Sequence, residues 1–355
     1  MNNKINQSIF LFLCFALLGL TSCSPKTQPD ELAATEQQAQ ASSSKSQTNP
    51  NQQIQKSLFL ISKNGKEGFI DRTGKVIIQP EYGLAFSFSE GLAPVNINSK
   101  WGYINQTGKI VVKPQFEEAG IFSENLAAVK TGSKWGYIND TGKIAIKAQF
   151  VEVEGFSERL ASVKIGNKWG YINPKGQVVI KPNYDEVSIF SEGLTSVRIG
   201  KKWGHIDKTG KVVIKPIFDE ASIFYEGLAS VKIGKKWAFI DKTGKVVIKP
   251  IFDEASIFYE GLAPVKIGNK WGFTNRKGLV VIKPIFDEIN VFSEGLATVR
   301  IGNKWGFINK TGKIVIKPQF DEVDSFSDGL AAVGSKDGKI GYIDKTGKFV
   351  WNPTK

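Results

Sequence analysis

The sequence has few of the residues that most catalytic and metal sites use. Its 355 residues include one histidine, His205, and two cysteines, Cys14 and Cys23. Two cysteines cannot supply a disulfide scaffold or a structural zinc site, since each needs several such residues. A single histidine also argues against nucleophile–base chemistry, which usually recruits histidine as the base. We therefore expect a protein that is not an enzyme, with no catalytic residue, no cofactor and no metal site.

Negative charge is also in short supply. Aspartate and glutamate number 34 against 47 lysines and arginines, which gives a net charge of +13. On charge alone, nucleic acid, anionic lipid and acidic glycan are admissible partners. Hydrophobic residues make up 41% of the chain, a fraction that is typical of globular proteins and excludes disorder along the whole length.

Long apolar runs are lacking except for one near the start. Ile9 to Leu20 follows Lys4 and leads into Thr21-Ser22-Cys23. The run is too short to cross a bilayer as a permanent helix, and it fits the core of a signal peptide. These residues resemble the lipobox leader of bacterial lipoproteins, in which the leader is cut before the cysteine and the cysteine is acylated. The resemblance implies a lipidated Cys23 that carries palmitate or similar chains, and an ordinary secretory leader is the alternative.

The leader predicts the first two parts of the chain. We expect a signal peptide at residues 1–22 and a lipidated cysteine with a disordered tether at residues 23–57. From Ser24 to Ser57 the chain is rich in Gln, Ser, Asn and Pro and has no aromatic residue, so it cannot bury enough apolar surface to fold. A coil of this length spans about 30 Å. We therefore expect an exported protein anchored in the cell membrane or the outer membrane, with no nucleic-acid partner.

The rest of the chain, residues 58–355, is a tandem repeat. Tryptophan recurs every 34 residues, and the same phase extends back to Glu67 and forward to Ile340. The spacing predicts nine units. Two neighbouring units, 203–236 and 237–270, are near copies that differ at four positions.

One unit predicts three antiparallel strands. Residues 296–301, 305–309 and 313–317 are rich in β-branched and aromatic residues and are separated by turn residues, and Pro318 follows the third run. The Asn-Lys-Thr-Gly stretch between the second and third runs indicates a type I turn that ends in a left-handed glycine. No stretch has a helical apolar period, so the predicted class is all-β.

The ends of the repeat favour an open, elongated array of three-stranded meanders. The first unit begins with its first strand at Leu58, and the last ends after its third strand at Pro353, so neither completes the other. Propellers commonly use four strands per blade and four to eight blades. A closed, propeller-like ring is the structural alternative.

The recurring Lys-Trp-Gly-Tyr/Phe-Ile-Asn/Asp-x-x-Gly-Lys-x-Val-Ile-Lys-Pro-x-Phe-Asp-Glu pattern resembles the WG repeat, also called the KWG repeat, of bacterial proteins. The resemblance covers residues 58–353 and implies an all-β repeat found in many envelope proteins. It implies no common activity and no catalytic residue. The pattern is broken at Glu67, Ala238 and Ile340.

The tryptophans have two possible roles. They can stack on sugar rings, or they can form core rungs between adjacent units. We favour core rungs, because the indole is replaced at the two end units by Glu67 and Ile340, where an exposed cap face is expected. His205 takes a place that is otherwise Tyr or Phe and is interpreted as a repeat variant.

The charged residues of the repeat are expected to have structural roles. Adjacent Asp-Glu pairs, such as Asp185-Glu186, point to opposite faces of a strand and cannot converge on one metal ion, so we expect them to pair with nearby lysines. The recurring lysines either protect edge strands or form a cationic stripe for anionic lipid or wall polymer, and their even spread favours protection. Glycine before each recurring leucine, replaced by Asn125 and Arg159, indicates a left-handed position.

Together these features predict a non-enzymatic, lipid-anchored scaffold of the bacterial cell envelope. Its expected partners are the membrane, through the anchor, and an unknown envelope protein or polymer, with no small-molecule substrate. The alternative is a carbohydrate or peptidoglycan binding protein that uses exposed aromatic residues. A hydrolase is a third reading, disfavoured because near-identical units offer no unique convergent site.

Overall fold

The computed structural model describes residues 57–336 and 338–354. The predicted signal peptide, the lipidated Cys23 and the predicted tether up to residue 56 lie outside the described residues. Within the described ranges, no helix has the length and apolar character needed to cross a membrane.

The described backbone forms nine antiparallel sheets, which we call blades 1 to 9 in chain order. Blade 1 has three strands, β1 (Leu58–Lys63), β2 (Lys66–Asp71) and β3 (Val76–Tyr82). Each of the other eight sheets has four strands. The strands of blades 2 to 5 are β4 (Leu84–Ala85), β5 (Leu92–Ile97), β6 (Lys100–Asn105), β7 (Ile110–Phe116), β8 (Glu118–Ser123), β9 (Leu126–Thr131), β10 (Lys134–Asn139), β11 (Ile144–Phe150), β12 (Glu152–Val153), β13 (Ala161–Ile165), β14 (Lys168–Ile172), β15 (Val178–Tyr184), β16 (Glu186–Val187), β17 (Leu194–Ile199), β18 (Lys202–Asp207) and β19 (Val212–Phe218).

The same pattern continues to the last blade. The strands of blades 6 to 9 are β20 (Glu220–Ala221), β21 (Leu228–Ile233), β22 (Lys236–Asp241), β23 (Val246–Phe252), β24 (Glu254–Ala255), β25 (Leu262–Ile267), β26 (Lys270–Asn275), β27 (Val280–Phe286), β28 (Glu288–Ile289), β29 (Leu296–Ile301), β30 (Lys304–Asn309), β31 (Ile314–Phe320), β32 (Glu322–Val323), β33 (Leu330–Gly334), β34 (Ile340–Asp344) and β35 (Phe349–Thr354).

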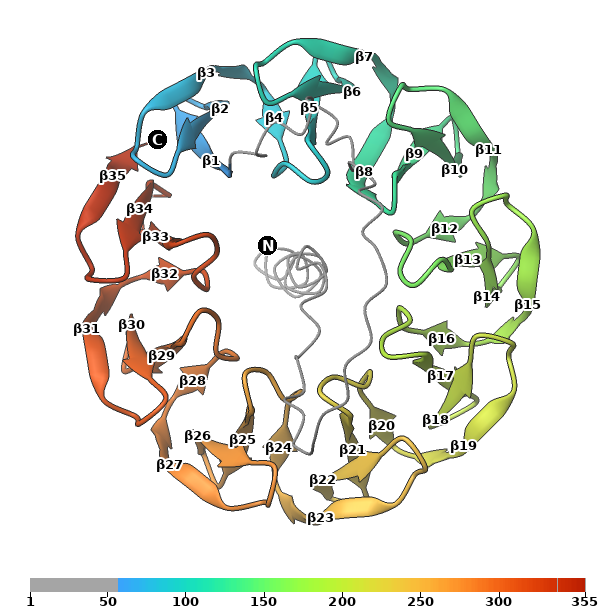
Figure 1. Cartoon of the computed structure of the whole chain (residues 1–355), viewed down its shortest axis with the longest axis vertical. Coiled ribbons are helices and arrows are strands. Elements are labelled where there is room, and N and C mark those ends of the chain that lie inside the picture. The colour runs from blue at the N-terminus through green and yellow to red at the C-terminus, as the bar shows by residue number, and fades with distance from the viewer. Residues whose placement is uncertain (1–56, 337, 355) are drawn as a thin grey trace, which may run out of the picture. The chain divides into compact units, whose positions relative to one another are not determined.

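The blades form a closed ring. Figure 1 shows them side by side around a circle, with the short strands such as β12 toward the centre, the long strands such as β15 at the circumference, and blade 9 beside blade 1. The Tyr342 hydroxyl of blade 9 donates a hydrogen bond of 2.6 Å to the Leu60 carbonyl of blade 1. Ile61 and Ile70 of blade 1 share a buried apolar cluster with Leu330 and Tyr342.

The fold is therefore a closed nine-bladed β-propeller, and the expectation of an open array was wrong. The alternative of a propeller-like ring is confirmed. The first and last units do not complete each other, and this is not evidence for an open array. The ring closes by packing whole blades against each other, so no blade has to be completed by a strand from the other end of the chain. The blade faces that an array would leave exposed at its two ends are buried on each other here, which stabilises the ring through apolar burial.

The three-stranded meander is confirmed, but most blades gain a fourth strand from the link before them. In blade 5 the two-residue strand β16 pairs with β17, with Glu186 opposite Arg198 and Val187 opposite Val197. Two residues carry no periodic pattern, so the sequence alone did not reveal this strand.

A tight hairpin turn joins this inner strand to the next. In blade 8, Ser293 and Leu296 bond to each other across Glu294 and Gly295, whose φ angles are 53° and 84°. Two consecutive left-handed residues define a type I′ turn. The left-handed conformation predicted at Asn125 and Arg159 is confirmed by φ angles of 65° and 68°. The sequence did not reveal that the preceding glutamate is left-handed as well.

A second turn joins the middle strand to the outermost strand at the same end of the blade. In blade 8 the Asn309 side chain accepts hydrogen bonds from the backbone N–H groups of Thr311 and Lys313, and Gly312 has a φ of 80°. This confirms the predicted turn. We call the side of the ring that carries both kinds of turn the turn face.

The geometry that recurs in the blades also explains the glycine that follows tryptophan. A Cβ atom on Gly306 would lie 2.5 Å from the Ile316 carbonyl oxygen and 2.6 Å from the Pro318 nitrogen. The outermost strand bulges against the middle strand at this point, between the pairs Trp305–Phe320 and Phe307–Ile316. Glycine therefore allows the two backbones to approach closely.

Candidate functional site

The buried contact between blades is made by the residue two places after each tryptophan. The hydroxyls of Tyr103, Tyr137 and Tyr171 each donate to a backbone carbonyl of the next blade, over 2.7–2.8 Å. These tyrosine side chains have no exposed surface. Their burial raises the pKa of each hydroxyl far above its ordinary value, so they remain neutral hydrogen-bond donors.

His205 occupies this same contact in blade 5. Its side chain is 0% exposed, lies edge-on to Phe224 with ring centroids 4.8 Å apart, and places Nε2 2.9 Å from the Ser222 carbonyl oxygen. Because a carbonyl only accepts, Nε2 carries the proton, and Nδ1 has no hydrogen-bond partner among the described residues. Burial lowers the pKa of His205 to about 4. The geometry agrees with a repeat variant.

Six of the repeat tryptophans are half-buried at the edge of the core, whereas Trp101 is buried within it. Lys130 lies over the ring of Trp135, with 5.7 Å between the ammonium and the ring centroid, and Arg300 lies over Trp305 at 6.0 Å. Trp101, which is buried, stacks on Phe86 at 4.9 Å. The structural role favoured from the sequence agrees with these contacts, but the fully buried rung lies two residues further along the strand.

The two units expected to be exposed caps are ordinary members of the ring. Glu67, which replaces the tryptophan in blade 1, accepts a hydrogen bond from the Ala85 backbone N–H of blade 2. Burial raises the pKa of this carboxyl. The expectation of a charge on a free end was wrong, because the closed ring has no free end.

The acidic pairs diverge as predicted. Asp185 receives a hydrogen bond of 2.6 Å from Lys168 of blade 4 and one of 2.7 Å from the Gly200 N–H of blade 5, whereas Glu186 pairs with Arg198. The hydrogen bond from Lys168 is the main cause that lowers the pKa of Asp185. Pairing with cations is confirmed, and Asp185 also joins two blades. No group of three or more metal-ligating side chains occurs in the described ranges.

A second set of carboxylates joins blades on the turn face. The left-handed glutamate of each hairpin turn accepts a hydrogen bond from a backbone N–H in the corresponding turn of the next blade. Seven described glutamates do so: Glu90, Glu124, Glu158, Glu192, Glu226, Glu260 and Glu294. Four of them also pair with a lysine of the next blade, in the pairs Lys208–Glu158, Lys242–Glu192, Lys310–Glu260 and Lys345–Glu294.

Glu90, Glu124 and Glu226 have no lysine partner among the described residues, and where blade 3 meets blade 4 both turns are also changed in sequence. Arg159 stands where most turns have glycine, and Pro174 stands where blade 5 has Lys208. Glu124 still accepts from the Arg159 backbone N–H at 2.8 Å, but no lysine pairs with it in the described part of the chain. Beside these residues lies an open recess of about 280 Å³.

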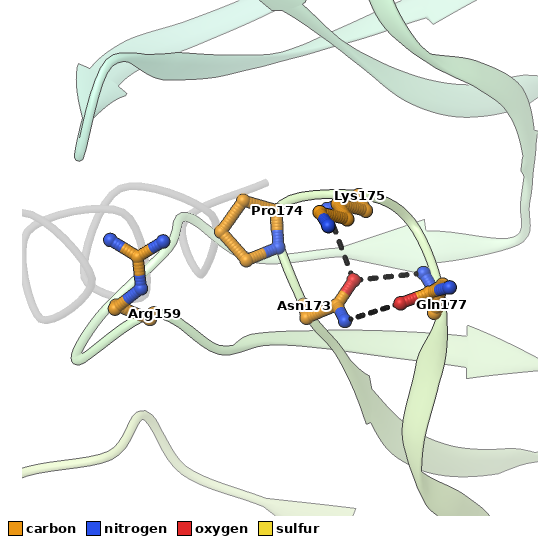
Figure 2. Close-up of a pocket in the computed structure, with 5 residues that line it drawn as sticks. All are labelled: Arg159, Asn173, Pro174, Lys175 and Gln177. Carbon is orange, nitrogen blue, oxygen red and sulfur yellow. Dashed lines mark hydrogen bonds between the residues drawn. The ribbon is translucent and has the colours of Figure 1, made fainter.

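The recess is built by two turns of blade 4. Figure 2 shows Arg159 on the hairpin turn and Asn173, Pro174, Lys175 and Gln177 on the turn between β14 and β15. The Asn173 side chain accepts from the Lys175 backbone N–H at 3.0 Å and donates to the Gln177 side chain at 2.9 Å. The sequence predicts only a strained backbone at Arg159. It does not predict the recess, because the turn that completes it is fourteen or more residues away along the chain.

The outer rim of the ring is a second candidate surface. Every outermost strand of the described blades has at least one exposed large apolar side chain, including Ile77, Ile110, Ile144, Val178, Val212, Val246, Val280, Ile314 and Phe349. In blades 5 to 7 the rim gains Ile217, Ile251 and Ile285, which are 62%, 53% and 60% exposed. Because exposed apolar side chains recur on neighbouring blades, the rim is a candidate interaction surface.

The rim is also cationic. Seven consecutive blades place an exposed lysine on the outermost strand, namely Lys113, Lys147, Lys181, Lys215, Lys249, Lys283 and Lys317. None of these seven forms an ion pair with a carboxylate of the described residues. Their position on edge strands is what the protective role predicted from the sequence requires, and it is equally what a binding rim requires.

The fold defines the class, a repeat propeller, and the sequence of the blades defines the family. The chain belongs to the WG repeat family, whose model, described as WG containing repeat, matches residues 68–101, 101–135, 135–169, 169–203, 203–237, 237–271, 271–305 and 305–339. This confirms the resemblance drawn from the repeated motif. No curated protein sequence matches the chain.

Solved structures align with this chain at low sequence identity. A eukaryotic initiation factor aligns at 11% identity over 85% of this chain and 98% of its own, with a TM-score of 0.60. BamB from Moraxella catarrhalis aligns at 10% identity over 81% of this chain and 99% of its own, with a TM-score of 0.49. The likeness to the initiation factor shows a common fold and nothing about partners.

Proposed function

We propose that this protein is a non-enzymatic, lipid-anchored scaffold of the bacterial cell envelope, and that its rim binds a protein or polymer partner. The observation that carries the proposal is the rim of blades 5 to 7, where Ile217, Ile251 and Ile285 are more than half exposed. Lys215, Lys249 and Lys283 stand two residues before them on the same strands. Apolar and cationic groups in one surface fit a partner that is both apolar and acidic.

The anchor part of the proposal rests on the leader. The apolar run Ile9 to Leu20 and the small residues before Cys23 support export and acylation of Cys23. More than one acyl chain on a residue gives stable anchoring, whereas one chain gives marginal binding. The membrane can be the cell membrane or the outer membrane.

Carbohydrate binding through the tryptophans has less support. A sugar ring needs an open indole face, and cations lie over the rings of Trp135, Trp169, Trp271 and Trp305 within 5.6–6.0 Å. Stacking would have to displace these cations from their carboxylate partners as well, as with Lys130, which pairs with Glu118.

Site-specific photo-crosslinking of the full chain in its native host tests the rim. A crosslinker at position 251 is expected to capture a defined partner, and one at position 201, an exposed lysine away from the rim, is not. Replacing Ile217, Ile251 and Ile285 with threonine should abolish the adduct formed from a rim position such as 249 and leave the melting temperature unchanged. Equal crosslinking from positions 249 and 201, or an adduct that survives the triple variant, contradicts the rim as the binding surface.

Mass spectrometry of the mature amino terminus tests the anchor. We expect an acylated cysteine at position 23 and partition of the protein into the detergent phase. Cys23→Ser should release the protein or leave the leader uncut. A free Cys23 thiol, or cleavage at another residue, contradicts lipid anchoring and leaves the rim proposal to its own experiment.

A further inference from the structure

The recess on blade 4 gathers unpaired positive charge from two turns. Arg159 and Lys175 are both exposed and line the same recess. Neither side chain forms an ion pair with a carboxylate within residues 57–336 and 338–354. Glu124 of blade 3 accepts a hydrogen bond from the backbone N–H of Arg159 and forms no ion pair with its guanidinium group among the described residues.

The backbone at Arg159 is held in a conformation that arginine disfavours. Its φ is 68°, and glycine occupies this position in blades 2, 5, 6, 7, 8 and 9. Glycine has no Cβ penalty in the left-handed region, so it is the better residue for the turn alone. A strained residue that the fold does not need points to a role for its side chain.

The loss of a lysine opens the space that the recess occupies. At the junction of blades 4 and 5, Lys208 reaches from its turn across to Glu158, with 2.9 Å between the ammonium and the carboxylate. In blade 4 the corresponding residue is Pro174, whose short ring forms one wall of the recess. Blade 4 therefore lacks the lysine that pairs with glutamate at the neighbouring junction. It has instead the unpaired Arg159 beside the space that this lysine would fill.

The chemistry of the recess fits one oxyanion group. A guanidinium presents a planar pair of donors that matches a carboxylate or a phosphate, and a nearby ammonium adds a point charge. At about 280 Å³ the recess is at the small end of ligand sites, so it can hold one such group while the rest of the molecule stays outside. We propose that the recess formed by Arg159, Pro174 and Lys175 binds a carboxylate or phosphate group of an anionic ligand, a site independent of the rim.

Titration of the full chain with two small probes tests the proposal. Pyrophosphate and citrate, added separately at constant ionic strength, should each perturb the side-chain Nε resonance of Arg159, and the tighter probe identifies the preferred oxyanion. Arg159→Gly, which restores the residue of most turns, should weaken binding at least tenfold while the ring stays folded. Lys201→Ala removes an exposed cation elsewhere and should leave binding unchanged.

Two further variants separate a built site from general attraction of anions. Pro174→Lys restores the lysine that pairs with glutamate at other junctions, so it should fill the recess and weaken binding. Gly193→Arg combined with Asp207→Asn, Lys208→Pro and Thr209→Lys transfers the arrangement to blade 5 and should add a second binding equivalent. No binding to the native chain, or equal losses in Arg159→Gly and Lys201→Ala, would overturn the proposal. A folded quadruple variant that still binds one equivalent would contradict the roles given to these positions.

Discussion

The contacts between blades and the outer rim of the ring follow opposite rules. Between blades, recurring polar side chains have partners in the next blade: Tyr103 bonds to Gly120, Glu158 to Gly193, and Asp185 to Gly200. On the rim, lysines and aliphatic side chains recur in every blade from 2 to 8 without such partners among the described residues. The comparison teaches that closure of the ring requires the contacts between blades, whereas the rim side chains have no such structural partner and stay accessible for the proposed binding.

The largest expected effect is at His205, inside a contact between blades. Its pKa is lowered from 6.5 to about 4 because burial disfavours the charged form. Between pH 6.5 and pH 4 the folded state therefore binds fewer protons than the unfolded state. The contribution of His205 to the free energy of unfolding is fully present above pH 6.5 and is lost as the pH falls toward 4. We expect a loss of about 3 kcal/mol when His205 is fully protonated.

Urea unfolding at pH 7 and at pH 4.5 measures this loss. The near-identical blade 6 has Phe239 at the same place, with its ring 4.8 Å from Phe258, so His205→Phe is the matched control. The variant should lose this part of the pH dependence. If the native chain and His205→Phe weaken equally on acidification, the buried histidine does not contribute.

The next effect distinguishes two junctions on the turn face. Glu158 accepts from the Gly193 N–H and pairs with Lys208, whereas Glu124 accepts only from the Arg159 N–H. We expect Glu158→Ala to lower the free energy of unfolding by about 1–2 kcal/mol, because a donor that was bonded loses its partner. Glu124→Ala should cost less, and equal costs measured by chemical denaturation would show that the lysine adds nothing.

A smaller effect of opposite sign is expected at Arg159. Arg159→Gly removes a side chain from a left-handed position, and we expect the chain to gain about 1 kcal/mol of stability. Gly193→Ala at the equivalent position of blade 5 should lose a similar amount, and both can be measured as shifts in the denaturation midpoint. A loss of stability in Arg159→Gly would mean that the arginine side chain supports the fold.

The smallest effect is expected on the rim. Replacing Ile217, Ile251 or Ile285 singly with threonine keeps a β-branched residue on the strand and removes exposed apolar surface. We expect each change to alter stability by less than about 0.5 kcal/mol. A larger loss of stability would show that the rim side chains support the fold as the contacts between blades do. The distinction between the two regions would then be wrong.

The sequence revealed local structure well and the global arrangement poorly. The spacing of tryptophan and the turn residues predicted the three long strands of each blade and the left-handed backbone at Asn125 and Arg159, because these depend on neighbours in the chain. Closure of the ring depends on contacts such as Tyr342 with Leu60, which are 282 residues apart. No periodic signal encodes such a contact, since every blade except blade 5 carries a tyrosine or phenylalanine at this position.

The candidate surfaces show the same limit. Arg159 was visible as an exception to a glycine, but its nearness to Asn173 and Lys175 follows from how the turns of one blade meet on the turn face. The exposed isoleucines at 217, 251 and 285 read as strand residues, and only the position of β19, β23 and β27 at the circumference shows that they face outward. The sequence identifies these residues, but it does not predict that their side chains are exposed.

Closure gives the near-identical units 203–236 and 237–270 a consequence for the history of the ring. They differ at only four positions, a degree of likeness that indicates duplication of one repeat unit. In a closed circle, an added blade narrows the angle available to every other blade, so all junctions must adjust together. The junctions rely on N–H and O–H donors aimed at oxygen acceptors, and the direction from which a donor approaches such an oxygen varies broadly. The diameter of the ring can therefore change by one blade at a time through duplication or loss of a repeat. A relative with fewer or more repeats can keep the same contacts between blades in a ring of another size.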